Sequence, residues 1–243
     1  MKVVLLRVGI DSGCGGCQSP LFKDGSFEFV PIPTIQAGET RTYTNIKCSG
    51  AGRRDKCLLD FLPAHVRRKH QTSAIHVDPE FETFTYGDPA SLKSRLRHLE
   101  LGDLLVFYAG LEGWDCDARP GLYIVGFFEV ERALRARNHP REELLKDFGD
   151  NFHVRHPDVF RDDTVVRDLV LVKGTSRSRL LKRAHLISAI GQNKKGKPLK
   201  ILSEEMRKVF GDFGGKVSFQ RCPPRWVAPE FIQTAREFVM GLE

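Results

Sequence analysis

The chain has 243 residues, of which 41% are hydrophobic and 28% charged, values typical of a globular protein with a sizeable core. Its 38 basic residues outnumber its 31 acidic residues, and the resulting net charge of +7 favours a polyanionic partner. The sequence has no apolar run as long as a membrane span and no signal-peptide pattern, so we expect a cytoplasmic protein with no membrane partner. In that compartment its six cysteines indicate thiols or metal ligands rather than disulfides.

The chain opens on an apolar run rich in β-branched residues, Val3–Ile10, which predicts a buried strand. A glycine-rich turn follows, and its glycines, carboxylate, thiols and hydroxyls belong to Asp11, Ser12, Gly13, Cys14, Gly15, Gly16, Cys17 and Ser19. Polar groups at the end of a buried strand are where α/β proteins place their sites, and glycine lets a ligand approach the backbone. We therefore predict a ligand-binding loop here, against the alternative of a plain tight turn.

Hydrophobic patterns, caps and breakers predict the remaining elements in chain order. Expected strands cover Phe27–Val30, Ala74–Pro79, Leu104–Tyr108, Leu122–Phe128 and Val165–Val172. Expected helices run from Asp88-Pro89 through Leu99, over Arg141–Phe148, from Ser203 onward and over Pro229–Val239. Residues 36–54 and 151–158 are expected as loops, and Lys173–Ser176 as a turn that caps a basic segment, Arg177–His185.

The two central strands are apolar on both faces, which places them in the middle of a sheet or in a closed barrel. Gly126, inside the second of them, predicts a bulge or a close contact. The chain has no internal repeat and no obvious linker. We therefore expect a single compact unit over residues 1–243, of mixed α+β class, with a mixed sheet or a partly closed β-barrel flanked by helices.

Cys14 and Cys17 have the two-residue spacing of a zinc knuckle, and Cys48 and Cys57 lie downstream. The second pair is separated by eight residues, which is unlike the usual ligand spacing. A thioredoxin-like redox role is disfavoured because the first pair is not at a helix start in a βαβ context. We favour unligated thiols and assign no metal ligand.

His76 and Asp78 lie two residues apart at the end of a predicted strand, so their side chains share one face. Such a pair can orient an imidazole for acid–base chemistry or hold a cation. The structural alternative is a turn that begins at Asp78-Pro79 beside a histidine of no catalytic role. Arg7 and Asp11, and Tyr86 and Asp88, are further polar residues at predicted strand ends.

Basic and aromatic residues together suit phosphates and unpaired bases. The basic clusters are Arg67–Lys69, Arg177, Arg179, Lys182-Arg183, Lys194-Lys195 and Lys197, and the candidates for stacking are Tyr108, Trp114, Tyr123 and Trp226. The alternative is a set of solvated faces and core aromatics. Lys173–Ser176 is similar to an anion-binding turn, although it lacks the order of a Walker motif.

Motifs along nearly the whole chain resemble one family. They are Arg7-x-Gly9-x-Asp11-Ser12-Gly13-x-Gly15-Gly16-x-x-Ser19-Pro20, Pro31-Ile32-Pro33, His76-x-Asp78-Pro79, Tyr86-Gly87-Asp88, Gly102–Tyr108, Leu171–Gly174, Ser178–Leu181 and Pro224–Val227. Together they resemble the nucleotide modification associated domain 3 family. That resemblance implies a role in DNA or nucleotide modification in prokaryotes or phages. The central strands are also similar to PUA-like barrels such as the EVE and ASCH domains, which read modified bases or RNA.

We therefore expect a protein that binds a nucleotide or nucleic acid, modified or not, within such a modification system. The loop residues Asp11, Ser12, Gly13, Gly15 and Gly16 are expected to form the floor of the site. The residues expected to converge on it are Arg7, His76, Asp78 and Tyr86, with Lys173 and Arg179 meeting phosphate.

Two other functions remain open from the sequence. One is an enzyme, a hydrolase or transferase acting on a modified nucleotide or base, with Asp11, His76 and Asp78 in acid–base or metal-assisted roles. The other is a protein–protein adaptor that uses an exposed apolar helix around Phe231 and Phe238. We assign no cofactor.

Overall fold

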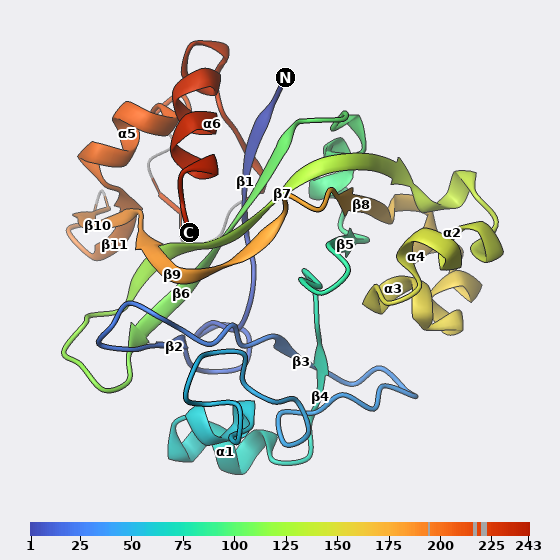
Figure 1. The fold of residues 1–243 in the computed structure, drawn as a ribbon, viewed down its shortest axis with the longest axis horizontal. Coiled ribbons are helices and arrows are strands. Elements are labelled where there is room, and N and C mark those ends of the chain that lie inside the picture. Colours follow the sequence, from blue (N-terminus) through green and yellow to red (C-terminus); the bar gives the residue numbers. More distant parts are fainter. Residues whose placement is uncertain (194, 216–217, 220–222) are drawn as a thin grey trace.

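The fold is taken from a computed structural model that describes residues 1–193, 195–215, 218–219 and 223–243 (Figure 1). Its main sheet has the strand order β12 (Arg225–Trp226), β1 (Val3–Arg7), β6 (Leu104–Gly113), β7 (Gly121–Arg135), β8 (Val170–Gly174) and β5 (Thr85–Asp88). Two further strands join it, β2 (Ser19–Leu21) on β6 and β9 (Arg179–Leu186) on β7. β1 runs parallel to β6, whereas β6 and β7 are antiparallel. This confirms a mixed sheet, and within the described residues it does not close into a barrel.

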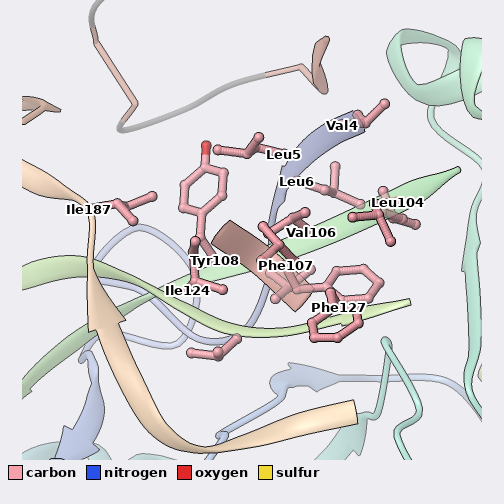
Figure 2. Close-up of a cluster of buried hydrophobic side chains, with 14 of the residues drawn as sticks. Val4, Leu5, Leu6, Leu104, Val106, Phe107, Tyr108, Ile124, Phe127 and Ile187 are labelled. Carbon is pink, nitrogen blue, oxygen red and sulfur yellow. The ribbon is translucent and has the colours of Figure 1, made fainter. Parts of the chain in front are cut away.

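The two strongest strand predictions form the centre of the sheet. β6 and β7 pair from Leu104 opposite Glu129 to Leu111 opposite Gly121, and their side chains are buried on both faces. Side chains of β1, β6 and β7 meet in the main hydrophobic core, part of which is shown in Figure 2. The register shifts beside Gly126, where a Cβ would lie 2.7 Å from the backbone oxygen of Arg179. The predicted close contact at this glycine is therefore confirmed.

Helices and short strands surround the sheet in three groups (Figure 1). α5 (Glu204–Phe210) and α6 (Ile232–Met240) pack against each other, and α6 contacts β1. At the far end of β7 and β8 lie α2 (Arg141–Phe148), α3 (Phe152–Arg155) and α4 (Asp163–Asp168). Beyond β2 lie α1 (Ala64–His70) and a short antiparallel pair of strands, β3 (Ile32–Thr34) and β4 (Ala74–His76). In the described part of the chain, none of the helices has the length and apolar character needed to cross a membrane.

The smaller elements complete the description. β10 (Ser188–Gln192) and β11 (Pro198–Leu202) form a hairpin of their own. Short 3₁₀ helices cover Leu58–Phe61, Ser91–His98, Ala136–Asn138, Pro157–Arg161 and Pro229–Phe231. The predictions for Arg141–Phe148, the helix after Ser203 and the C-terminal helix are confirmed, and the Ser203 side chain caps α5 through the Met206 N–H.

Two predictions were wrong, those for Phe27–Val30 and residues 151–158, and two were confirmed only in part. Phe27–Val30 is not a strand, because Ser19–Leu21 takes the place beside β6. The segment after Pro89 folds as a 3₁₀ helix, Ser91–His98, that begins after Ala90 without a side-chain cap. Residues 151–158 form helices instead of a loop, since the Asn151 side chain accepts the His153 N–H and caps α3. Val165–Val172 divides into the end of α4 and β8, where local hydrogen bonds to Asp162 override the β-branched pattern.

The basic segment after Ser176 was also expected in a different form. It folds as the strand β9, on which Lys182 and Arg183 are exposed, and basic side chains commonly protect strand edges. The turn Lys173–Ser176 therefore does not cap a helix. The Thr175 hydroxyl donates to the Glu129 carboxylate at 3.1 Å, and the Ser178 hydroxyl accepts the Glu129 N–H at 3.1 Å. These bonds fasten the turn to β7.

Candidate functional site

A cavity of about 580 Å³ lies beside the glycine-rich loop that follows β1. Its lining residues are Arg7, Asp11, Ser12, Gly13, Gln18, Lys200 and Ser218. Arg7 ends β1, the next residues belong to the loop, and Lys200 comes from β11, far along the chain. The predicted loop therefore forms one wall of a cavity whose opposite wall is built by the C-terminal third of the chain.

Asp11 holds the loop and the guanidinium beside it. Its Oδ1 accepts the N–H groups of Gly13 and Cys14, each at 2.7 Å, and its Oδ2 lies 3.1 Å from Nη2 of Arg7. A carboxylate that accepts backbone N–H groups two and three residues ahead fixes a tight turn. Both oxygens of Asp11 are thus engaged in shaping the loop and orienting Arg7.

Gly15 and Gly16, which follow this turn, allow its backbone conformation and do not line the cavity. Gly15 and Gly16 have φ of 101° and 96°, a region that side chains rarely adopt. A Cβ on Gly15 would lie 2.3 Å from the Ile10 side chain, so the glycine also permits close packing there. From α1, Nε2 of His70 contacts the Gly15 carbonyl oxygen at 3.1 Å. Ser12 and Gly13 line the cavity, while Gly15 and Gly16 support it from behind.

Several polar groups in the cavity wall have unused hydrogen-bonding capacity. Among the described residues, neither the buried Nε of Arg7 nor the buried Oε1 of Gln18 has a hydrogen-bond partner. Lys200 is half-buried, and burial, together with the nearby Arg7 charge, lowers the pKa of its ammonium. Gly110 on β6 makes room for the amide, because a Cβ there would fall 1.6 Å from Oε1 of Gln18. The cavity thus presents two cations, one carboxylate and one amide.

A second cluster forms around Asp78. Oδ2 of Asp78 lies 3.8 Å from Nε2 of His76 and 3.6 Å from Nε2 of His153. The Gly87 N–H on β5 donates to both carboxylate oxygens, at 3.2 and 2.9 Å. Nδ2 of Asn151 is 3.5 Å from the same Oδ2. The cluster therefore joins β4, β5 and the start of α3.

Packing keeps this cluster largely dry. The side chains of Asp78 and His153 are 4% and 7% exposed, whereas that of His76 is 20% exposed. Burial raises the pKa of Asp78 to about 6 and lowers the pKa of His153 to about 3, so the imidazole of His153 is neutral near pH 7. The His76 ring lies against Phe152, with their centroids 3.8 Å apart.

The structure does not bring the cavity and the Asp78 cluster together. Within the described residues, no hydrogen bond, ion pair or shared lining residue connects the cavity to the His76–Asp78–His153 cluster. The reason is side-chain alternation along β4 and the two residues that follow it: Ile75 and Val77 pack with Ile10 behind the loop, so His76 and Asp78 face the other way.

The remaining predicted site residues lie elsewhere. Tyr86 donates its hydroxyl to Asp88 at 2.9 Å, next to the Asp78 cluster. Nζ of Lys173 donates to the carbonyl oxygens of Thr83 and Asp147, at 2.9 and 3.1 Å. The Arg179 guanidinium covers the Phe127 ring at 5.2 Å.

The aromatic side chains considered for stacking differ in their accessibility. Tyr108 and Tyr123 are buried in the sheet, whereas Trp114 is 42% exposed. The Arg95 guanidinium lies 5.2 Å from the Trp226 ring. Of the basic residues, Lys194 lies outside the described residues, and Lys195 and Lys197 are exposed on the β10–β11 turn.

Cys14 is exposed, while Cys17 and Cys48 are buried. Burial raises the pKa of Cys17 to about 11 and that of Cys48 to about 12. The thiols are therefore protonated near pH 7 and poorly suited as nucleophiles.

Sequence reasoning missed Gln18, Lys200 and His153. Gln18 lies within the predicted glycine-rich turn, between Cys17 and Ser19, and its polar side chain there was the available signal. Lys200 and His153 reach their sites only through the packing of distant segments, and no local pattern marks them.

The fold and the cavity define a class: a mixed α+β protein with a polar, cationic cavity at the carboxyl end of its first strand. The sequence model of nucleotide modification associated domain 3 matches residues 2–239, and the chain belongs to this family. Neither a curated protein nor a solved structure matches the chain. The family links the protein to nucleotide modification systems.

Proposed function

We propose that the protein binds a nucleotide or nucleic acid in the cavity beside the loop after β1, as the recognition component of a nucleotide modification system. One observation carries the proposal. The wall of this cavity holds a buried guanidinium nitrogen and a buried amide oxygen that lack hydrogen-bond partners among the described residues. Buried polar atoms are rarely left unpaired, and a ligand toward which the Arg7 and Gln18 side chains turn would supply the missing partners.

Charge and size agree with such a ligand. Arg7 and Lys200 supply two positive charges against the single carboxylate of Asp11, which favours an anion such as phosphate. The Gln18 amide is suited to hydrogen bonds with a base edge. A volume of about 580 Å³ falls among those of small-molecule sites.

The two alternatives receive less support from the same geometry. Asp11 has both carboxylate oxygens engaged, so an enzyme would depend on His76 and Asp78, outside this cavity. The adaptor function called for an exposed apolar helix, yet Phe231 and Phe238 are partly buried and pack against the core.

The test is salt-dependent binding to single-stranded and duplex DNA, with and without modified bases, followed by fluorescence anisotropy and by competition with free nucleotides. Lys200→Gln removes a cavity charge, and Lys197→Gln removes an exposed charge from the same hairpin as the matched control. If Lys200 meets a phosphate, Lys200→Gln lowers the slope of log affinity against log salt by about 0.7–0.9, whereas Lys197→Gln leaves it unchanged.

Two results would overturn the proposal. One is the absence of saturable binding of any of these probes by the folded protein. The other is an equal effect of the two lysine variants, which would place the ligand away from the cavity.

A further inference from the structure

We propose that His76, Asp78 and His153 form a binding site for a divalent transition-metal ion. The site is distinct from the nucleotide cavity and adds a cofactor to the protein. Among the described residues, this is the group of His, Cys, Asp and Glu side chains whose ligand atoms converge, all within 4.8 Å of one another.

The distances are those of a metal site that has not yet closed around its ion. Zinc lies about 2.0–2.1 Å from imidazole nitrogen and carboxylate oxygen, so ligand atoms at tetrahedral angles are about 3.3 Å apart. Oδ2 of Asp78 lies 3.6 and 3.8 Å from the two Nε2 atoms. These two separations exceed the tetrahedral value by a few tenths of an ångström. The three ligand atoms all lie within 4.8 Å of one another, so metal binding would also draw them together by up to about 1.5 Å.

A purely structural role does not account for the imidazoles. Nε2 of His76 and Nε2 of His153 are both buried, and neither has a hydrogen-bond partner among the described residues. A structural histidine in a dry environment normally pairs its ring nitrogens. Here two unpaired nitrogens lie 3.6 and 3.8 Å from one buried carboxylate oxygen, an arrangement that a cation would satisfy.

Neighbouring groups fix the orientation of the ligands. The Gly87 N–H donates to both oxygens of Asp78, and Phe152 packs against the His76 ring. Gly87 also lets α3 approach β5, because a Cβ there would lie 2.9 Å from Cδ2 of His153. Outer contacts of this kind hold metal ligands in place before the metal arrives.

The ligand types select the metal class. Two imidazoles and one carboxylate suit Zn²⁺, Fe²⁺ and similar ions and disfavour Mg²⁺ and Ca²⁺, which prefer oxygen. Three protein ligands also leave at least one coordination position for water or a substrate. His76, the most exposed of the three side chains, marks the side from which a fourth ligand reaches the ion.

The test is titration of the chelator-treated, untagged full chain with Co²⁺, followed by visible absorption, and competition by Zn²⁺. We expect one Co²⁺ per chain with no sulfur-to-metal charge-transfer band. His76→Gln is expected to weaken binding by more than about 100-fold, beyond the range usual for outer contacts of a metal site. His98→Gln is the matched control, since His98 is exposed and is not a member of the cluster, and it is expected to leave affinity unchanged.

Two further variants test the carboxylate ligand and exclude a cysteine ligand. Asp78→Asn tests the carboxylate if a histidine variant unfolds, and circular dichroism establishes that each variant tested is folded. Cys14→Ser is expected to bind Co²⁺ as the wild type does. Absence of binding, equal affinity of His76→Gln and His98→Gln, or loss of binding in Cys14→Ser would each overturn the proposal.

Discussion

Gly110→Ala changes the cavity beside the loop after β1 by adding a single methyl group. Gly110 lies on β6, paired with Leu122 on β7. The new Cβ would fall 1.6 Å from Oε1 of Gln18 and 2.8 Å from its Cδ, so the amide must leave its place in the cavity wall. The three heavy atoms nearest to this Cβ all belong to the Gln18 side chain. The substitution therefore acts on the amide and leaves the backbone of the sheet in place.

The expected magnitudes separate folding from binding. Replacing a strand glycine with alanine gains about 0.5–1 kcal/mol of backbone entropy. Forcing Gln18 into another rotamer costs about 0.5–1.5 kcal/mol, so the free energy of unfolding should change by less than about 1 kcal/mol. Loss of one hydrogen bond to the ligand costs about 0.5–1.5 kcal/mol, which is about a 2- to 12-fold rise in Kd.

A double-mutant cycle with Gln18→Ala tests this reasoning. If the methyl group acts through the amide, Gly110→Ala weakens binding in the wild type and has no effect once Gln18 is alanine. The assay is anisotropy with whichever nucleotide or oligonucleotide binds, alongside urea unfolding. Additive effects of the two substitutions would refute the reasoning, as would a loss of more than about 3 kcal/mol of stability in Gly110→Ala.

Two predictions concern stability away from the cavity. Glu28→Ala should cost about 3–5 kcal/mol in urea unfolding, because the buried Glu28 carboxylate pairs with the Arg53 guanidinium at 2.8 Å and accepts the N–H groups of Ser49 and Gly50. Exposed Glu131→Ala should stay within about 0.5 kcal/mol, and equal effects of the two substitutions would contradict the prediction. Burial raises the pKa of Cys17 to about 11 and of Cys48 to about 12, so the native state keeps protons that an unfolded thiol loses above about pH 8.5. Stability should therefore fall as pH rises from about 8.5 to 11, and a flat urea midpoint across that window would show that these thiols are not buried.

Elements with strong local signals were predictable from the sequence. β6 and β7 carry uninterrupted apolar runs, and α5 begins at a serine that caps it. The elements that were mispredicted are those for which tertiary partners decide. Val165 to Val172 has the composition of one strand, but only its second part finds a neighbour in β5 and β7. A β-branched run becomes a strand only where another strand's edge is available to it.

The candidate site was likewise predictable only where a local sequence signal marks its residues. The loop after β1 carries its own signal, and Arg7, Asp11, Ser12 and Gly13 are together in the cavity wall. Alternation correctly placed His76 and Asp78 on one face of their strand, but alternation does not say which face meets the loop. Ile75 packs with Ile10, so the histidine and the aspartate turn toward α3 instead.

The contacts between the two sites give their arrangement a functional consequence. In the sheet order β1 and β5 are separated by β6, β7 and β8, but Ile75 and Val77, which flank His76, pack with Ile10, the residue before Asp11. Among the described residues, the cavity and the metal cluster share no lining residue. A ligand held at Arg7 and Lys200 and a metal held at Asp78 therefore need not compete, and a polynucleotide longer than one nucleotide would be able to contact both. The length dependence of binding thus separates the two cases: if metal occupancy raises the affinity of a long single strand but not of a mononucleotide, one substrate spans both sites, and equal effects on both lengths would rule that arrangement out.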